Sequence, residues 1–325
     1  MEGFKSEPDL AVLCATDDRY APYCGIMLTS LLENNKELNL KVYVFVNGEL
    51  SNSNKHKFYQ LGETYKCPLE LVVVDEAMLR PIVPIYTTNH VITLPTYYRL
   101  LAADLLPADL HRVLYLDCDM VVTGDLRFLS EVSLEDAAVG VVKDCVFNAN
   151  EEPYQRLGYP MSSGYFNAGM LVMNLDFWRT HAVRHQLEEF IGQKKDALYF
   201  MDQDALNGVL YNQKVMLPER YNMQTEYFYR KPWNSYSLSF QETLKAELKN
   251  AVVIHYCGSM KPWQFLSTGL PFQEKWDEYR RISLWKHCRS FLPLQRHLKW
   301  MVKRVFFPIR WRKQRRDFWA LDDKM

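Results

Sequence analysis

The sequence predicts an α/β fold in which a mostly parallel sheet is flanked by helices. Short apolar runs alternate along the chain with segments of helical spacing, which is typical of βαβ units. Several of these runs end in Asp, Asn or His, as expected where strands of an open sheet stop at a ligand-binding edge. The 325 residues suit one large domain with a small appendage.

Each expected strand is an apolar run bounded by polar residues. The first, LAVLCA, stops at Thr16-Asp17-Asp18, and the second is KVYVFV. The full set of expected strands is 10–15, 41–46, 69–74, 112–116, 138–142, 170–173 and 252–255.

The expected helices follow these strands and carry apolar side chains at helical spacing. In the first helix the spacing is set by Ile26, Leu28, Leu31 and Leu32, and Ser51 is the predicted N-cap of the second. The expected helices cover 20–34, 51–66, 96–106, 176–195 and 202–211.

Cysteine usage and the first residues predict a cytoplasmic protein. The seven cysteines form no CxxC pair, which argues against zinc ribbons and thioredoxin-type motifs and favours reduced thiols. The opening MEGFKSEPDL carries acids where a signal peptide has bases, and no run of about 18 apolar residues occurs. We therefore expect neither a signal peptide nor a transmembrane helix.

The net charge of zero hides a strong asymmetry. Residues 279–316 hold 13 Lys or Arg and no Asp or Glu, whereas the first 278 residues have a net charge of −11. Bases interleaved with Trp, Phe and Leu suit a helix on an anionic membrane surface. A helical face packed on the body and a nucleic-acid contact are the alternatives. We predict a domain over 1–270 and a basic aromatic helical tail over 271–325 that attaches to the membrane surface, with no nucleic-acid partner.

Two carboxylates, Asp117 and Asp119, follow an apolar strand in the stretch RVLYLDCDMVV. In an extended chain they point to the same side and can reach one cation. Carboxylate oxygens favour Mg²⁺ or Mn²⁺, which would in turn hold phosphate oxygens. The alternative is a solvated turn after the strand.

A second acidic motif, ATDDRY, follows the first strand. A carboxylate such as Asp17 can accept hydrogen bonds there from a ribose or a base. The alternative is an N-cap for the next helix.

The segments FNAGMLVMN and MDQD offer groups that suit sugar hydroxyls. Asn167 precedes Ala-Gly, which allows close backbone approach, and its amide both donates and accepts. Asp202, Gln203 and Asp204 alternatively cap the helix that follows, although capping explains Gln203 less well.

The late strand ends in HYCGSMKPW. There His255 can ligate a metal, Gly258 allows a ligand close to the backbone, and Lys261 is a point charge suited to phosphate. A lone His is usually no ligand, but the two aspartates still lack a third partner.

Taken together, these motifs resemble the retaining glycosyltransferases of family 8, which include bacterial lipopolysaccharide galactosyl- and glucosyltransferases and the glycogenins. The resemblance runs from about residue 10 to residue 265. The bacterial lipopolysaccharide branch is the closer likeness. The matching stretches are ATDDRYA, LPTYYRLLAADLLP, RVLYLDCDMVV, FNAGMLVMNLDFWR, DQDALNG and HYCGSMKPW.

The resemblance implies a GT-A fold, a UDP-glucose or UDP-galactose donor, Mn²⁺ (or Mg²⁺), and retention at the anomeric carbon. The acceptor would be a glycan such as lipopolysaccharide core or another cell-surface glycolipid, met at the inner face of the cytoplasmic membrane. It implies that Asp117, Asp119 and His255 are the metal ligands and that Gln203 and Asp202 are catalytic. The implied UDP-sugar contacts are Ala15, Asp17, Arg19, Arg99, Asp117, Asp144, Asn167, Asp202, Gln203, Gly258 and Lys261.

Two residues depart from the family pattern. Arg19 replaces a residue that is often small and polar, and Cys118 lies between the two aspartates, where we expect its side chain to point into the core. Two other functions stay open: a metal-dependent nucleotide-sugar hydrolase, and a catalytically inactive UDP-sugar-binding protein at a membrane surface.

Overall fold

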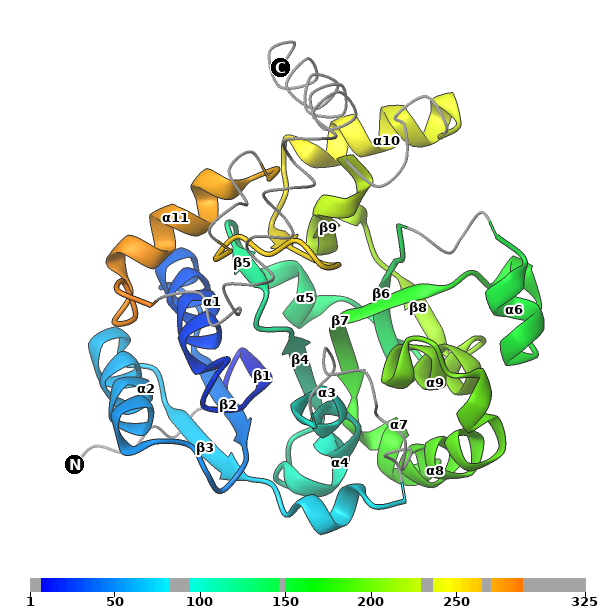
Figure 1. Ribbon diagram of the computed structural model, residues 1–325, viewed down its shortest axis with the longest axis horizontal. Helices are drawn as coiled ribbons and strands as arrows, with labels where there is room; N and C mark the ends of the chain where they lie inside the picture. The colour runs from blue at the N-terminus through cyan, green and yellow to red at the C-terminus, as the bar shows by residue number, and fades with distance from the viewer. Residues whose placement is uncertain (1–6, 82–93, 146–149, 229–235, 265–269, 289–325) are drawn as a thin grey trace, which may run out of the picture.

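The computed structural model describes residues 7–81, 94–145, 150–228, 236–264 and 270–288. Within these residues, seven strands form one sheet in the order β3-β2-β1-β4-β7-β6-β8, and three form a small sheet in the order β5-β10-β9 (Figure 1). The large sheet contains β1 (Leu10–Thr16), β2 (Leu40–Val46), β3 (Leu69–Val73), β4 (Arg112–Leu116), β6 (Val139–Lys143), β7 (Phe166–Asn174) and β8 (Lys214–Met216). The small sheet contains β5 (Met120–Val122), β9 (Met223–Gln224) and β10 (Val253–His255).

The large sheet is mostly parallel, which confirms the predicted fold class. β1 runs parallel to β2 and β4, β2 to β3, and β6 to β8, whereas β7 runs antiparallel to both β4 and β6. In the middle of the sheet, Leu13 lies opposite Tyr43 on one side and Tyr115 on the other. All seven residues of β1 are buried, because helices cover both faces of the sheet.

Alternate side chains of β1 enter two hydrophobic clusters, one on each face. Val12 and Cys14 pack with the helices of one face, and Leu13 and Ala15 pack with those of the other. The first face is covered by α1 (Ala21–Asn34), α2 (Asn52–Tyr65) and α11 (Gln273–Ile282). The second is covered by α3 (Pro95–Tyr98), α4 (Ala102–Leu105), α7 (Leu175–Thr180), α8 (Val183–Lys194) and α9 (Met201–Leu210).

Shorter helices complete the fold and correct some sequence-based expectations. These helices are α5 (Arg127–Glu131), α6 (Glu152–Leu157) and α10 (Leu238–Leu248). The helix expected over 176–195 is split into α7 and α8, because Ala182 adopts a left-handed conformation with φ of 49°. The helix expected over 96–106 is interrupted by a 3₁₀ turn at Arg99–Leu101. The predicted N-cap Ser51 is confirmed, since its side chain accepts a hydrogen bond from the Asn54 N–H at 3.3 Å.

The first part of the predicted tail packs on the body. The Trp285 ring is buried against Gly25 of α1, and its Nε1–H donates to Asn54 Oδ1 at 2.8 Å. The Tyr279 hydroxyl accepts a hydrogen bond from Asn34 of α1 at 2.8 Å. Tyr279 and Trp285 thus join the described start of this segment to α1 and α2. The rest of the predicted tail, 289–325, lies outside the described residues.

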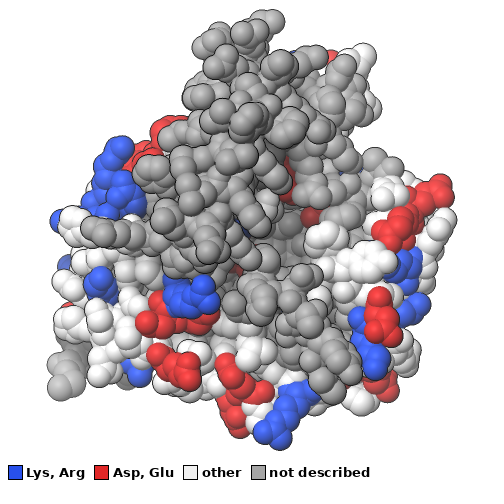
Figure 2. Space-filling view, viewed as in Figure 1, with Lys and Arg blue, Asp and Glu red and all other residues white. Residues whose placement is uncertain are grey.

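Charges of both signs lie side by side around the margin of the face shown in Figure 2. They include the acidic and basic side chains of α11, whose sequence is QEKWDEYRRI. Among the helices that the structure describes, none has the length and apolar character needed to cross a membrane.

Candidate active site

Two adjoining cavities open beside the turn that follows β4. We call them the Ala15 cavity, of about 210 Å³, and the Gln203 cavity, of about 280 Å³. The residues that line both are Thr96, Arg99, Asp117, Asp119 and Gly258. The Ala15 cavity is also lined by Ala15, Thr16, Asp17, Tyr20, Pro95, Tyr115, Cys118 and Lys261. The Gln203 cavity is also lined by Asp144, Asn167, Ala168, Gly169, Phe200, Asp202, Gln203, Glu226, His255 and Cys257.

Asp117, Asp119 and His255 converge at the wall between these cavities, and we call them the carboxylate–histidine cluster. Each offers one ligand atom, and these atoms all lie within 4.8 Å of one another. The aspartates lie in a turn between β4 and β5. His255 lies close to them because β10 pairs with β5, with His255 opposite Met120. A side chain on Gly169 would overlap the His255 ring and approach Asp117 Oδ2 to 3.0 Å, so glycine leaves room for the cluster. Two carboxylates and an imidazole fit a divalent cation such as Mn²⁺.

Opposite charges surround Asp119. Lys261 Nζ donates to Asp119 Oδ2, and His255 Nε2 lies 3.3 Å from Asp119 Oδ1. Burial alone would raise the pKa of Asp119, but Lys261 and His255 hold it well below its ordinary value. Burial lowers the pKa of His255, but the Asp119 carboxylate raises it by more than burial lowers it. The resulting pKa is about 9, above the ordinary value. A metal ion at this cluster must therefore displace a proton from His255.

Arg99 fixes the other carboxylates. Its guanidinium is buried and lies 2.9 Å from Asp117 Oδ1 and 3.1 Å from Asp202 Oδ2. The Tyr115 hydroxyl donates to the same Asp117 oxygen at 2.7 Å, and Arg99 stacks over the Tyr115 ring at 4.3 Å. Burial raises the pKa of Asp202 to about 6, although the charge of Arg99 opposes that rise. Arg99 thus holds Asp117, on the wall shared by the two cavities, and Asp202, on the wall of the Gln203 cavity.

Amide side chains organise the Gln203 cavity. Gln203 Oε1 accepts from the Ala168 N–H at 3.0 Å, and its Nε2 donates to Asp144 Oδ2 at 3.3 Å. Asn167 Nδ2 donates to the same Asp144 oxygen at 3.2 Å. One carboxylate therefore orients two amides that come from β7 and α9.

Asn222, which sequence reasoning missed, joins this network to the metal ligands. It is fully buried, donates from Nδ2 to Asn167 Oδ1 at 2.9 Å, and places its Oδ1 3.0 Å from His255 Nδ1. Because that oxygen accepts, the network assigns the proton to Nδ1 of the neutral imidazole and leaves Nε2 for a metal. No local sequence pattern marks Asn222, because its partners are distant in the chain.

Two aspartates accept hydrogen bonds from backbone N–H groups near a helix start, although the N-cap residues themselves are Tyr20 for α1 and Phe200 for α9. Asp17 Oδ1 accepts from the Tyr20 N–H at 2.8 Å at the start of α1, although Asp17 also lines the Ala15 cavity. Asp204, within the first turn of α9, accepts from the Tyr199 and Phe200 N–H groups at 2.7 and 2.8 Å and so fixes the chain that enters the helix. In the MDQD motif, Asp202 and Gln203 therefore reach the cavity and Asp204 is structural.

The positions of three further residues can be compared with what the sequence predicts. Arg19 is exposed and is not among the described residues that line either cavity. The Cys118 thiol is buried, as predicted, and donates to the Ala15 carbonyl at 3.1 Å. Gly258 lines both cavities with a φ of 77°, a conformation that favours glycine. The other expected donor contacts, Asp144, Asn167 and Lys261, all lie on a cavity wall.

Comparisons with known proteins identify the family of the chain. The family model of Glycosyl transferase family 8 matches residues 11–267. General stress protein A of Bacillus subtilis is 30% identical over 278 residues, which are 84% of this chain and 93% of that protein. Lipopolysaccharide 1,2-glucosyltransferase of Escherichia coli is 28% identical, with 85% of this chain and 76% of that protein covered. Lipopolysaccharide 1,3-galactosyltransferase of Salmonella typhimurium is 26% identical, with 87% and 81% covered.

The solved structures place the fold. Galactosyltransferase LgtC, crystallised with donor and acceptor sugar analogues, has a TM-score of 0.72 and 25% identity, and the match covers 89% of this chain and 99% of LgtC. The bifunctional glycosyltransferase WbbM has a TM-score of 0.75 at 24% identity, with 88% of this chain and 52% of WbbM covered. At this identity the match is evidence for a shared fold only. The chain therefore has the GT-A fold and belongs to glycosyl transferase family 8.

Proposed function

We propose that the protein is a retaining, metal-dependent hexosyltransferase that moves glucose or galactose from a UDP-sugar to a glycan acceptor. The observation that carries this proposal is the carboxylate–histidine cluster at the wall between two cavities, one suited to a nucleotide and one lined by amides and carboxylates. Relatives named as lipopolysaccharide glucosyl- and galactosyltransferases support a lipopolysaccharide core or similar glycolipid as the acceptor.

Asp117, Asp119 and His255 would hold the cation, with Mn²⁺ preferred over Mg²⁺ because one ligand is an imidazole. The ion, when bound, supplies positive charge that stabilises the leaving diphosphate. Lys261 adds a second positive charge. Burial lowers its pKa, but Asp119 raises it above its ordinary value, so Lys261 stays protonated. Lys261 and the backbone at Gly258 would bind the diphosphate.

The Ala15 cavity would receive the uridine. Asp17 would accept hydrogen bonds from it with the carboxylate oxygen that does not accept from the Tyr20 N–H, and the small side chain of Ala15 leaves space. Arg99 would contact the donor from the wall that both cavities share. We propose no contact for Arg19, because it lies on the exposed surface.

The Gln203 cavity would hold the hexose through Asp144, Asn167 and Asp202. During transfer, the bond between the anomeric carbon and the diphosphate oxygen breaks, and its electron pair leaves with UDP. The acceptor oxygen bonds to the same face of the sugar, and its proton passes to the leaving phosphate oxygen. An amide is a poor nucleophile, so Gln203 would stabilise the positive charge that develops on the sugar.

Substitution of Gln203 tests this role. In Gln203→Ala we expect kcat of transfer to fall by about 100-fold with little change in KM for the donor, because the stabilisation arises in the transition state. Exposed Gln60→Ala on α2 is the matched control. Proton NMR of the product should show the anomeric configuration of the donor. A Gln203→Ala enzyme with unchanged kcat and KM, or an inverted product, would contradict the mechanism.

We also propose that the enzyme meets its acceptor at the inner face of the cytoplasmic membrane through the basic side chains of residues 279–316. Each Lys or Arg near an anionic lipid surface contributes about 1 kcal/mol to the binding free energy of such a segment. Replacing Lys299, Lys303 and Arg304 with Gln in the full chain should weaken binding to anionic vesicles in low salt and leave binding to neutral vesicles unaltered. Equal binding of the variant and the parent to anionic vesicles would contradict this attachment.

A further inference from the structure

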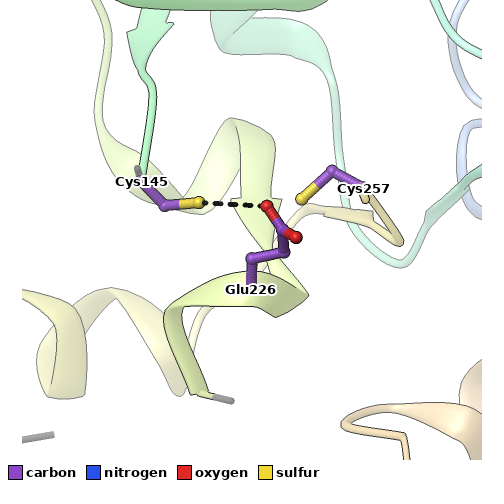
Figure 3. A group of neighbouring side chains, drawn as sticks. All are labelled: Cys145, Glu226 and Cys257. Carbon is purple, nitrogen blue, oxygen red and sulfur yellow. Dashed lines mark hydrogen bonds between the residues drawn. The ribbon is translucent and has the colours of Figure 1, made fainter. Parts of the chain in front are cut away.

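A second group of potential metal ligands, Cys145, Glu226 and Cys257, lies beside the Gln203 cavity, and we call it the thiol cluster. One ligand atom from each residue lies within 4.8 Å of the other two, and Cys145 Sγ is 4.0 Å from Glu226 Oε2. The three side chains point toward one another, with the Glu226 carboxylate between the two sulfurs (Figure 3).

The three residues come from separate parts of the chain. Cys145 follows β6, Glu226 lies in the 3₁₀ turn Thr225–Phe228, and Cys257 follows β10. Each is buried, with 8%, 7% and 8% of its surface exposed. The fold therefore gathers two thiols and a carboxylate away from bulk water, although none of the three is near another in sequence.

The surrounding contacts hold the ligands in place. The side chain of Gln224 accepts from the Cys145 N–H at 2.9 Å and donates to the Lys143 carbonyl at 2.7 Å, which fixes the chain that carries the first thiol. A Cβ on Gly258 would overlap the Glu226 carboxylate, so glycine lets the loop after Cys257 pass beside it. Ligands that are fixed in this way favour metal binding, because less ordering is needed.

The ligand chemistry differs from that of the carboxylate–histidine cluster. Thiolates favour soft and borderline cations such as Zn²⁺, whereas carboxylates favour Mg²⁺ and Mn²⁺. Open zinc sites have three protein ligands drawn from Cys, His and carboxylates, and a fourth position for water or substrate. Glu226 and Cys257 line the Gln203 cavity, so that fourth position would face the cavity.

We propose that Cys145, Glu226 and Cys257 form a second metal site, which binds Zn²⁺ through two thiolates and one carboxylate. Binding releases the two thiol protons to solvent, and the metal does not change oxidation state. The proposal concerns metal binding only and stands whether or not the enzyme transfers hexose.

Cobalt(II) gives a direct test, because its bonds to thiolate absorb in the near ultraviolet and its bonds to carboxylate and imidazole do not. The full-length protein is kept under a phosphine reductant with excess Mn²⁺ and titrated with Co²⁺. We expect one Co²⁺ per chain with a thiolate band that Zn²⁺ abolishes. Asp119→Asn, at the other cluster, should keep this band.

Two variants locate the site. Cys145→Ser should weaken the band and lower Co²⁺ affinity at least about 10- to 100-fold, the range already seen when only a supporting residue is lost. Glu226→Gln, which preserves shape and both thiols, should keep the band but also lower affinity. Cys67→Ser is the matched control, because Cys67 is a free thiol with the same 8% exposure that contacts the Leu40 carbonyl.

Three results would overturn the proposal. They are a parent protein with no thiolate band at saturating Co²⁺, a Cys145→Ser band as strong as the parent's, and a band lost in Cys67→Ser. If Cys145→Ser does not fold, as judged by thermal unfolding, the Glu226→Gln titration decides. An affinity equal to that of the parent would then contradict the site.

Discussion

The two ligand clusters share one cavity but differ in how their charge is balanced. In the carboxylate–histidine cluster, Asp117 is paired with Arg99 and Asp119 is paired with Lys261 and His255. The thiol cluster instead offers two thiols and one carboxylate, and burial raises the pKa of the Cys145 thiol well above its ordinary value. The charged groups of the first cluster therefore suit cations and phosphates. The second cluster suits only metals that bind thiolate strongly.

The comparison also separates what can be predicted from sequence. Asp117 and Asp119 stand two residues apart directly after a strand, so a local pattern reveals them. Cys145, Glu226 and Cys257 are separated by 30 residues or more, and only tertiary structure brings them together.

The strongest test of the comparison removes one charge from the first cluster. Asp119→Asn eliminates the carboxylate between Lys261 and His255, so we expect kcat/KM for transfer to fall at least about 100- to 1,000-fold. Asp125→Asn, at an exposed carboxylate after β5, is the control and should be close to the parent. Activity of Asp119→Asn within tenfold of the parent would show that the cluster is not required.

Gly258 belongs to both regions, and its substitution should affect folding. Alanine there must adopt a φ near 77° and overlap the Glu226 carboxylate, so we expect a loss of about 1–3 kcal/mol in the free energy of unfolding. Denaturant titration measures this loss. Gly48→Ala is the control, because a Cβ at Gly48 meets no atom within 4 Å. Equal stabilities for the two variants would mean that the loop relaxes without cost.

Asn222→Ala tests the link between the Gln203 cavity and the metal ligands. Without the Asn222 oxygen, the His255 ring loses its partner at Nδ1, so the Kd for Mn²⁺ should rise about 10- to 100-fold. Exposed Asn250→Ala is the control in the same calorimetric titration. An unchanged Kd would remove Asn222 from the metal site.

The smallest expected effect is the change of Mn²⁺ affinity with pH at the carboxylate–histidine cluster. His255 in the metal-free fold has its pKa raised from 6.5 to about 9, so its proton stabilises the fold below pH 6.5 and this stability disappears as pH rises through about 9. Because Mn²⁺ must displace that proton, its affinity should increase roughly tenfold from pH 7 to pH 8 and level off above about 9. Calorimetry in two buffers would detect the released proton, and a flat profile would contradict the assignment.

Much of the large sheet was predictable because its strands are continuous apolar runs. The expected strand over 112–116 coincides with β4, and the one over 10–15 misses β1 by only one residue. The short strands β5, β8 and β9 have two or three residues, too few for any periodicity, and β9 exists because it pairs with β10. The break between α7 and α8 depends on the left-handed conformation of Ala182, which no residue preference signals.

The candidate site divides in the same way. The structure brings Asp117, Asp119, His255 and Gln203 to the Gln203 cavity, and each lies at the end of a strand, directly after one or in the first turn of a helix. Arg19 is an expected UDP-sugar contact, but it is exposed and is not among the described residues that line either cavity. Asn222 and Glu226 escaped prediction because their roles arise only from contacts between distant segments.

The most direct test of metal-dependent hexosyl transfer is UDP release from a panel of UDP-sugars. The panel contains UDP-glucose, UDP-galactose and their N-acetylated forms, each measured with Mn²⁺ and then with EDTA. The proposal predicts turnover of glucose or galactose donor with Mn²⁺ and its loss with EDTA. No UDP release from any donor of the panel, together with UDP binding that does not depend on Mn²⁺, would contradict both the donor class and the metal site.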